Sequence, residues 1–185
     1  VKFLSDDALV KVSAYYASLD PAQPVVTKAA KGGAKPDPVA AGRAAAAGCA
    51  GCHGDGGGTK IPGMPSLVGL DPKYLVAAMK AYKSGQRKHD MMKSLLGALG
   101  DAELNNIALY YALQKPARAQ TPATGNAAAG KAAAAACAAC HGEAGVSAKP
   151  PPPSPAGPGA PHFAGANSRY SRGARQGEAT EGAAA

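Results

Sequence analysis

The chain has 185 residues, with 24 Gly, 16 Pro, two Phe and no Trp, and its net charge is +8 with a pI near 9.4. Its basic residues accompany no nucleic-acid-binding motif or aromatic stacking platform, which argues against nucleic-acid binding, and no apolar stretch approaches the roughly 20 residues of a membrane span. So few large apolar side chains bury little area. Either little of the chain folds, or an apolar group that is not an amino acid fills its centre.

The first predicted element is an amphipathic helix near the N-terminus, and its sequence recurs later in the chain. Residues 3–21 match residues 98–116 at an offset of 95, including a Tyr-Tyr pair and a closing proline. In the second copy Leu104, Ile107 and Tyr111 recur at helical spacing. Both segments are therefore predicted to be helices that end at the proline.

A second repeat pairs residues 41–55 with residues 129–143 at an offset of 88. The repeating unit starts with an Ala-rich helix, passes through C-x-x-C-H and ends with the Tyr-Tyr helix, so the chain is expected to be a piece of a longer multi-unit protein. The expected organisation is the C-terminal helix of a truncated preceding unit at 1–20, a linker at 21–39, one complete unit at 40–116, a linker at 117–128, the start of a further unit at 129–148 and a tail at 149–185. Without a unit of its own, helix 1–20 is expected to be mobile or loosely packed on the complete unit.

The two C-x-x-C-H motifs contain all four cysteines of the chain. C-x-x-C-H is the attachment signature of c-type haem, in which two thiols bind one porphyrin and the adjacent histidine binds the iron. A zinc site would need its second cysteine pair from 88 residues away. A thioredoxin-like redox pair would need a strand–turn–helix context, which the sequence does not show. The matching flanks around both motifs favour haem over these two alternatives and over a chance occurrence. The porphyrin also supplies the missing apolar centre. The predicted thioether residues are Cys49, Cys52, Cys137 and Cys140, and the predicted histidine ligands are His53 and His141.

The complete unit resembles a class I cytochrome c, in particular the tandem domains of bacterial di-haem and multi-haem cytochromes c and the cytochrome subunit of flavocytochrome c sulfide dehydrogenases. The matching motifs are C-A-G-C-H-G, P-S-L-V-G-L, Y-L-x-x-x-M-x-x-Y-K-S-G-x-R and the Tyr-Tyr helix. The resemblance implies a small all-α fold packed around a covalently bound haem. It also implies that the Pro65 carbonyl accepts the Nδ1–H of His53, and that Leu67 and Leu70 pack on the porphyrin. Family members often carry an aromatic before the cysteines, and here Tyr110 and Tyr111 are expected to fill that gap.

The sixth iron ligand is expected to be a methionine. The candidates are Met64, Met79, Met91 and Met92, and the resemblance selects Met92, with its neighbour Met91 as the alternative register. Met64 and Met79 are expected to be packing residues. His89 would instead give a bis-histidine site, but it lies in a charged run typical of a solvated loop.

Residues 149–185 are rich in Pro, Gly, Ala and Arg and contain no methionine. Such a composition buries little. We expect either a disordered extension or an out-of-frame translation of a normal further domain, and favour the second. Haem at Cys137 and Cys140 would then lack a methionine ligand and most of its pocket, and His162 could reach the iron only by accident.

These features predict an electron carrier and not an enzyme, because iron with both axial positions filled transfers electrons without binding substrate. Haem c attachment implies an oxidising compartment, by analogy the periplasm, with the signal peptide in a segment before residue 1. The alternative is the electron-accepting subunit of a flavin- or quinone-dependent dehydrogenase. Redox partners with an acidic surface are expected to dock on a basic cluster. This cluster consists of Lys83, Arg87, Lys88 and Lys93.

Overall fold

The structure is a computed structural model that describes residues 4–21, 37–116, 124–147, 153–157 and 159–173. Within these ranges the regular elements are all helical, and no helix is both long and apolar enough to cross a bilayer. The α-helices are α1 (Asp6–Ser18), α2 (Pro38–Ala45), α3 (Ala50–His53), α4 (Pro72–Ser84), α5 (Asp90–Gly97), α6 (Asp101–Ala112), α7 (Ala127–Ala133), α8 (Ala135–His141) and α9 (Ala160–Ser171), and the 3₁₀ turns are η1 (Ala46–Cys49) and η2 (Asp55–Gly57).

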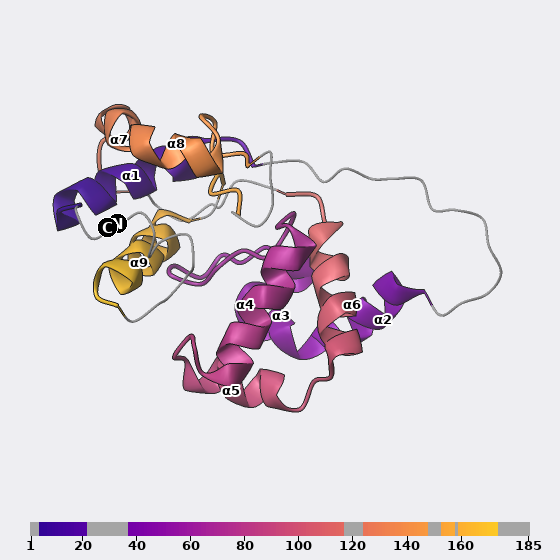
Figure 1. The fold of residues 1–185 in the computed structure, drawn as a ribbon. Coiled ribbons are helices and arrows are strands. Elements are labelled where there is room, and N and C mark those ends of the chain that lie inside the picture. The colour runs from indigo at the N-terminus through magenta and orange to yellow at the C-terminus, as the bar shows by residue number, and fades with distance from the viewer. Residues whose placement is uncertain (1–3, 22–36, 117–123, 148–152, 158, 174–185) are drawn as a thin grey trace.

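The elements from α2 to α6 form the first unit, residues 37–116, on the right of Figure 1. Helix α2 crosses α6, and α4 packs against both α5 and α6. The buried core lies where these helices meet, with Leu104 and Ile107 of α6 at most 2% exposed and Leu75, Met79 and Leu96 at most 9% exposed. The predicted all-α fold is confirmed.

Local sequence signals place the ends of the helices. The Asp37 carboxylate accepts a hydrogen bond from the Val39 amide at 2.9 Å and caps α2, which begins at Pro38, two residues before the predicted start of the unit. Asp71 caps α4 in the same way, with Pro72 at its first position. Gly85 ends α4 at φ 83°, a left-handed conformation that favours glycine.

The second unit contains α1, α7, α8 and α9, which group on the left of Figure 1 although α1 lies at the other end of the chain from the rest. Helix α1 packs against α7 and α9. Val12 and Tyr16 of α1 are each 1% exposed and lie in one cluster with Ala134. The expectation that residues 1–20 would be mobile or loosely packed on the complete unit is therefore wrong for the described residues 4–21, because α1 buries its apolar face in a different unit.

The tail also differs from expectation. Helix α9 occupies residues 160–171, and residues 153–157 (P-S-P-A-G) stand 88 positions after P-S-L-V-G at 65–69. Tyr170 keeps the same offset from Tyr82. The prediction of a disordered tail is therefore wrong for α9, and the retained offset gives no support to an out-of-frame origin. Residues 148–152, 158 and 174–185, like the linker segments 22–36 and 117–123, lie outside the described residues.

Candidate cofactor site

The first C-x-x-C-H motif spans the junction of two short helical turns. Cys49 ends η1, whereas Cys52 and His53 lie in α3. Both thiols are free and half-buried, while the imidazole is only 6% exposed. Gly54 then takes φ 79°, which favours glycine and turns the chain back under the histidine. The motif therefore places two thiols and one imidazole on adjoining turns.

A single hydrogen bond fixes the orientation of the histidine. The Nδ1 of His53 lies 2.9 Å from the carbonyl oxygen of Pro65, so Nδ1–H donates and Nε2 keeps its lone pair for a metal. The predicted contact between these residues is present. It crosses from α3 to the loop before α4, and therefore ties the ligand to a second segment of the unit.

Thr59 holds the intervening loop, and sequence reasoning did not identify it. Its Oγ1 donates to the Cys52 carbonyl at 3.0 Å and accepts from the Ile61 amide at 3.1 Å. The residue is 6% exposed. A lone threonine in a glycine-rich loop is the signal that could have identified it, because a buried hydroxyl needs partners.

The predicted pocket residues line the same region. Leu67 and Leu70 are half-buried and pack against the core cluster, as does Cys49. The Leu67 amide donates to the Gly57 carbonyl at 2.8 Å, which joins this segment to η2. Leu67, Leu70 and the Cys49 thiol therefore pack against one apolar cluster.

The structure separates the methionine candidates by burial. Met92 is half-buried and packs against the core cluster, whereas its neighbour Met91 is 60% exposed. Met79 is 9% exposed in the core, in agreement with its expected packing role, and Met64 is half-buried. His89 is exposed and caps α5, its Nδ1 accepting from the Met92 amide at 3.4 Å. Of the two methionines in α5, the arrangement favours Met92.

The Tyr-Tyr pair lies against the Ala-rich helix. Tyr111 is 2% exposed in the core cluster, and burial raises the pKa of its phenol; a hydrogen bond with Cys49 adds to the shift. Burial likewise raises the pKa of the Cys49 thiol. The Tyr110 ring lies 5.1 Å from that of Tyr111. A Cβ at Gly42 would overlap the Asn106 carbonyl, so glycine is required where α2 and α6 cross. The expected role of the two tyrosines agrees with this packing.

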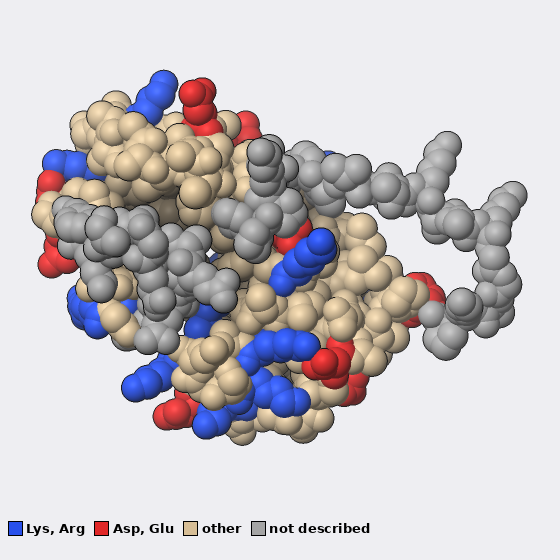
Figure 2. All heavy atoms as spheres, in the orientation of Figure 1, with Lys and Arg blue, Asp and Glu red and all other residues tan. Residues whose placement is uncertain are grey.

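The predicted basic cluster is exposed at three of its four positions. Lys83, Lys88 and Lys93 are exposed, whereas Arg87 is half-buried with its guanidinium 5.6 Å from the ring of Tyr74. Figure 2 shows Lys and Arg side chains gathered at the lower edge of the molecule, where α4 and α5 lie in Figure 1. Within the predicted cluster the exposed charge is therefore carried by the three lysines, and we call these three residues the lysine patch.

The second motif repeats the proximal geometry of the first. His141 Nδ1 lies 2.7 Å from the carbonyl oxygen of Pro153, which stands 88 positions after Pro65. The Nδ1 of His162 lies 3.3 Å from the Gly63 carbonyl of the first unit. The expectation that most of this pocket would be missing is wrong on the histidine side. The two cysteine pairs also belong to different units, so a zinc site built from all four does not fit.

Comparisons with known proteins agree with this geometry. Residues 37–110 match the family described as cytochrome C oxidase, cbb3-type, subunit III. The cytochrome subunit of sulfide dehydrogenase from Chlorobaculum tepidum is 33% identical over 84 residues, which are 45% of this chain and 74% of that protein. The chain belongs to the c-type cytochromes. Cytochrome c4 of Pseudomonas aeruginosa is 43% identical to this cytochrome over 77 residues, 42% of this chain and 38% of the relative.

The fold of this cytochrome is also similar to that of a solved relative. The crystal structure of reduced recombinant cytochrome c4 from Pseudomonas stutzeri matches with a TM-score of 0.64 and 26% identity, over 77% of this chain and 85% of that chain. The matched 77% of this chain is a larger share than residues 37–116 alone, so the structural match extends beyond the first unit. By sequence, however, the chain spans only about two fifths of the length of the cytochrome c4 from P. aeruginosa.

Haem c is the cofactor of this family, and the site fits it. Two free thiols lie on adjoining turns beside an imidazole whose Nδ1–H is already bonded to the Pro65 carbonyl. The residues that would hold the group are Cys49 and Cys52 through thioethers, His53 through Nε2, and the half-buried apolar wall of Leu67 and Leu70.

Proposed function

We propose that the unit at residues 37–116 is an electron carrier of an exported compartment, with one haem c held by Cys49 and Cys52 and with His53 and Met92 as axial ligands. The group supplies a one-electron Fe(III)/Fe(II) couple when bound. The observation that carries the proposal is the 2.9 Å contact from His53 Nδ1 to the Pro65 carbonyl, because it commits the other ring nitrogen to the metal.

The residues of the unit shield the histidine ligand from water and fix its orientation. His53 is 6% exposed, and Leu75 and Met79 of the adjoining core are at most 9% exposed. Burial of this kind lowers the local polarity, which favours the less charged, reduced state and raises the reduction potential. Met92 would add a thioether ligand, which would act in the same direction and leave no iron position open for a substrate. These properties support a carrier.

Two further features support the proposed compartment and the proposed redox partner. The two C-x-x-C-H motifs support an exported location, by analogy the periplasm, because haem is attached to c-type cytochromes outside the cytoplasm. The lysine patch supports docking of an acidic redox partner, because complementary charge accelerates association. The match to a cytochrome subunit of sulfide dehydrogenase supports the alternative, an electron-accepting subunit of a flavin- or quinone-dependent dehydrogenase.

The test of the proposal is an absorption spectrum combined with a haem count per chain. The purified chain should show a Soret band and a sharp α-band on reduction, and the pigment should remain on the denatured polypeptide. Replacing Cys49 and Cys52 together by Ala should lower the count by one. A chain with no covalently bound pigment after expression with haem-attachment machinery would contradict the proposal, and co-purification with a flavin or quinone protein would favour the dehydrogenase alternative.

The docking surface has its own test. Reversing the lysine patch to Glu should slow oxidation by the anion ferricyanide more than oxidation by the cation tris(phenanthroline)cobalt(III), and salt should reduce the difference. A matched variant reverses three exposed lysines elsewhere. Equal effects of the two triple variants would show that only net charge matters. The matched lysines are Lys60, Lys115 and Lys131.

A further inference from the structure

We propose that the second C-x-x-C-H motif holds a second haem c and that helix α1, from the opposite end of the chain, closes this site as α6 closes the first. The proposal rests on the proposed function in one respect, the attachment of haem c to C-x-x-C-H. The new element is the composite unit, in which residues 4–21 complete the site begun by residues 124–147, 153–157 and 159–173.

The first argument is that α1 buries the same face as α6. At the offset of 95, each deeply buried position of α6 has an equally buried counterpart in α1, and both members of every pair are at most 3% exposed. Burial of this depth shows that α1 has the packing environment of a closing helix and not that of an exposed extension. The pairs are Leu9 with Leu104, Val12 with Ile107, Ser13 with Ala108, and Tyr16 with Tyr111.

The second argument is the crossing of α1 with α7. Gly130 stands 88 positions after Gly42, and a Cβ there would overlap the Lys11 carbonyl and lie 2.9 Å from the Cβ of Tyr15. The corresponding distance from Gly42 to Tyr110 is 3.0 Å. Each unit therefore needs a glycine at the same point of its helix crossing.

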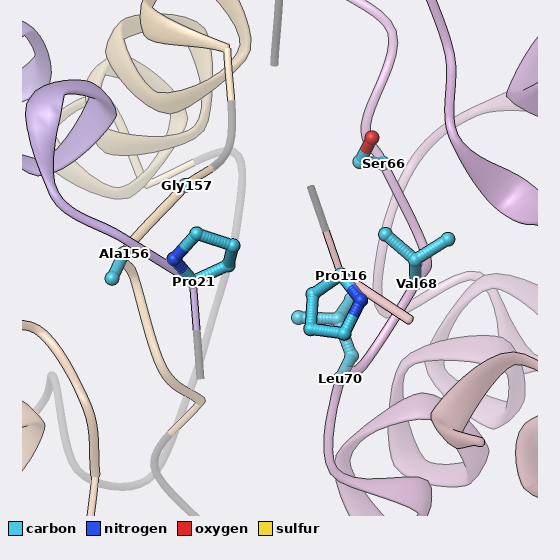
Figure 3. Close-up of a pocket in the computed structure, with 7 residues that line it drawn as sticks. All are labelled: Pro21, Ser66, Val68, Leu70, Pro116, Ala156 and Gly157. Carbon is cyan, nitrogen blue, oxygen red and sulfur yellow. The ribbon is translucent and has the colours of Figure 1, made fainter. Parts of the chain in front are cut away.

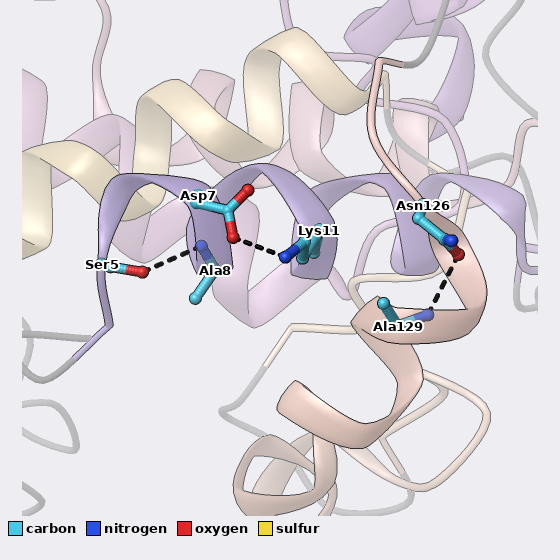
Figure 4. Close-up of polar contacts among 6 residues, drawn as sticks. All are labelled: Ser5, Asp7, Ala8, Lys11, Asn126 and Ala129. Carbon is cyan, nitrogen blue, oxygen red and sulfur yellow. Dashed lines mark hydrogen bonds and ion pairs between the residues drawn. The ribbon is translucent and has the colours of Figure 1, made fainter.

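Helices α1 and α7 each begin with a side-chain cap. Figure 4 shows the Ser5 hydroxyl accepting from the Ala8 amide at the start of α1 and the Asn126 side chain accepting from the Ala129 amide at the start of α7, at 3.2 and 3.1 Å. Each helix therefore begins with its own cap, so their contact joins two regular helices.

The third argument concerns the residues around the motif. Ser147 Oγ donates to the Cys140 carbonyl at 3.2 Å, as Thr59 does to Cys52 in the first unit. Tyr16 forms a hydrogen bond with Cys137, as Tyr111 does with Cys49. The contacts of α1 therefore include one of the thiols that would bind the group.

The fourth argument is the backbone connection between α1 and the segment that follows His141. The Gly157 amide donates to the Tyr16 carbonyl at 3.1 Å, and the Gly69 amide donates to the Tyr111 carbonyl at 2.9 Å. The Phe163 ring of α9 lies 5.2 Å from that of Tyr16. Helix α1 therefore contacts the Ala-rich helix, the motif and the proline segment, which are the elements that define the histidine side of the site.

The matching segments of the two units face each other across a small hollow. Figure 3 shows Pro21, Ala156 and Gly157 of the second unit on one side and residues of the first unit on the other. Pro21 and Pro116 correspond at the offset of 95. The two units thus meet through equivalent segments, which is the arrangement expected of two related domains and not of a helix docked by chance. The residues on the side of the first unit are Ser66, Val68, Leu70 and Pro116.

The decisive experiment is amide hydrogen exchange on the intact chain, with one motif removed at a time. Replacing Cys137 and Cys140 by Ala should remove the second haem and lower the protection of α1 by roughly ten- to a hundredfold, while α6 keeps its protection. Replacing Cys49 and Cys52 by Ala should remove the first haem and lower the protection of α6, while α1 keeps its protection. Unchanged exchange in α1 after loss of the second haem would overturn the proposal.

A matched pair of glycine variants tests the helix crossing without touching the motif. Gly130→Val should raise exchange in α1 and α7 by about ten- to a hundredfold, since overpacking a close crossing is destabilising, and Gly42→Val should do so in α2 and α6. A wild-type chain with one haem, bound at Cys49 and Cys52, would refute the second site and leave the proposed function standing. Protection of α1 that falls on dilution would mean that a second copy supplies the helix, which also overturns the proposal.

Discussion

Thr59→Val perturbs the loop that holds the histidine ligand while keeping the shape of the side chain. The hydroxyl makes two hydrogen bonds, one to the Cys52 carbonyl at 3.0 Å and one from the Ile61 amide at 3.1 Å, and the residue is 6% exposed. Valine preserves the volume and removes both hydrogen bonds. The change therefore isolates the polar contribution of one side chain.

The expected cost follows from these two contacts. A typical intramolecular hydrogen bond contributes about 1 kcal/mol to the free energy of unfolding, so the loss of two should cost about 2 kcal/mol. In a unit of this size, a loss of that magnitude lowers Tm by roughly 8–16 °C.

The assay is thermal unfolding followed by the absorbance of the haem in the first unit. Thr59→Ser serves as the control because it keeps both hydrogen bonds and loses one buried methyl, worth about 0.8 kcal/mol. Valine should therefore destabilise more than serine. If Thr59→Val unfolds at the temperature of the wild type, the two hydrogen bonds do not stabilise the loop and the reasoning is refuted.

Three further predictions concern the first unit, two of them with a matched control variant. Met92→Ala should convert the low-spin spectrum to high-spin and lower the reduction potential, whereas exposed Met91→Ala should leave both unchanged; the opposite pattern would assign the ligand to Met91. Leu104→Ala, at a site 0% exposed, should lower the free energy of unfolding in denaturant by about 2–5 kcal/mol. Leu95→Ala, at a site 51% exposed, should lower it by less than about 0.5 kcal/mol. Similar losses at both sites would contradict the assigned core. A hydrogen bond from Lys80, and then the charge of that lysine, lower the pKa of the exposed Asp101 carboxyl. The contribution of this carboxyl to the free energy of unfolding is therefore present above the pKa that it has in the unfolded chain, and it disappears as pH falls through its folded pKa. The Tm difference between wild type and Asp101→Asn should accordingly vanish in acid and in high salt, and a difference that persists in acid would show another origin.

The chemistry of the first site could be predicted from sequence because it depends on residues that are close in the chain. Cys49, Cys52 and His53 lie on adjoining helical turns, so their spacing already brings them together. The position of Pro65 was accessible through the resemblance, and the structure contains its hydrogen bond. Thr59 escaped notice because only the folded loop shows that its hydroxyl is buried between two backbone groups.

The second unit was misjudged for two physical reasons. The segment P-S-P-A-G at 153–157 lies in a run of prolines, and composition hid the offset of 88 that it shares with P-S-L-V-G at 65–69. Helix α9 also lacks the strong apolar pattern of α4, so propensity gave little signal for a helix at Ala160–Ser171. Its Phe163 nevertheless packs on Tyr16, a contact that no local pattern contains.

The sequence by itself determined which residues carry the chemistry and which segments are copies of one another, because motif spacing and repeat offsets are properties of the chain. The tertiary structure alone decided which copies assemble. Helix α1 has the sequence of a closing helix, and sequence comparison could not say which Ala-rich helix it would meet. The close crossing at Gly130 and the burial of Val12 and Tyr16 assign it to the second unit. The physical reason is that apolar faces pair by shape and contact in space, and the distance along the chain between them adds only a slowly growing entropic cost.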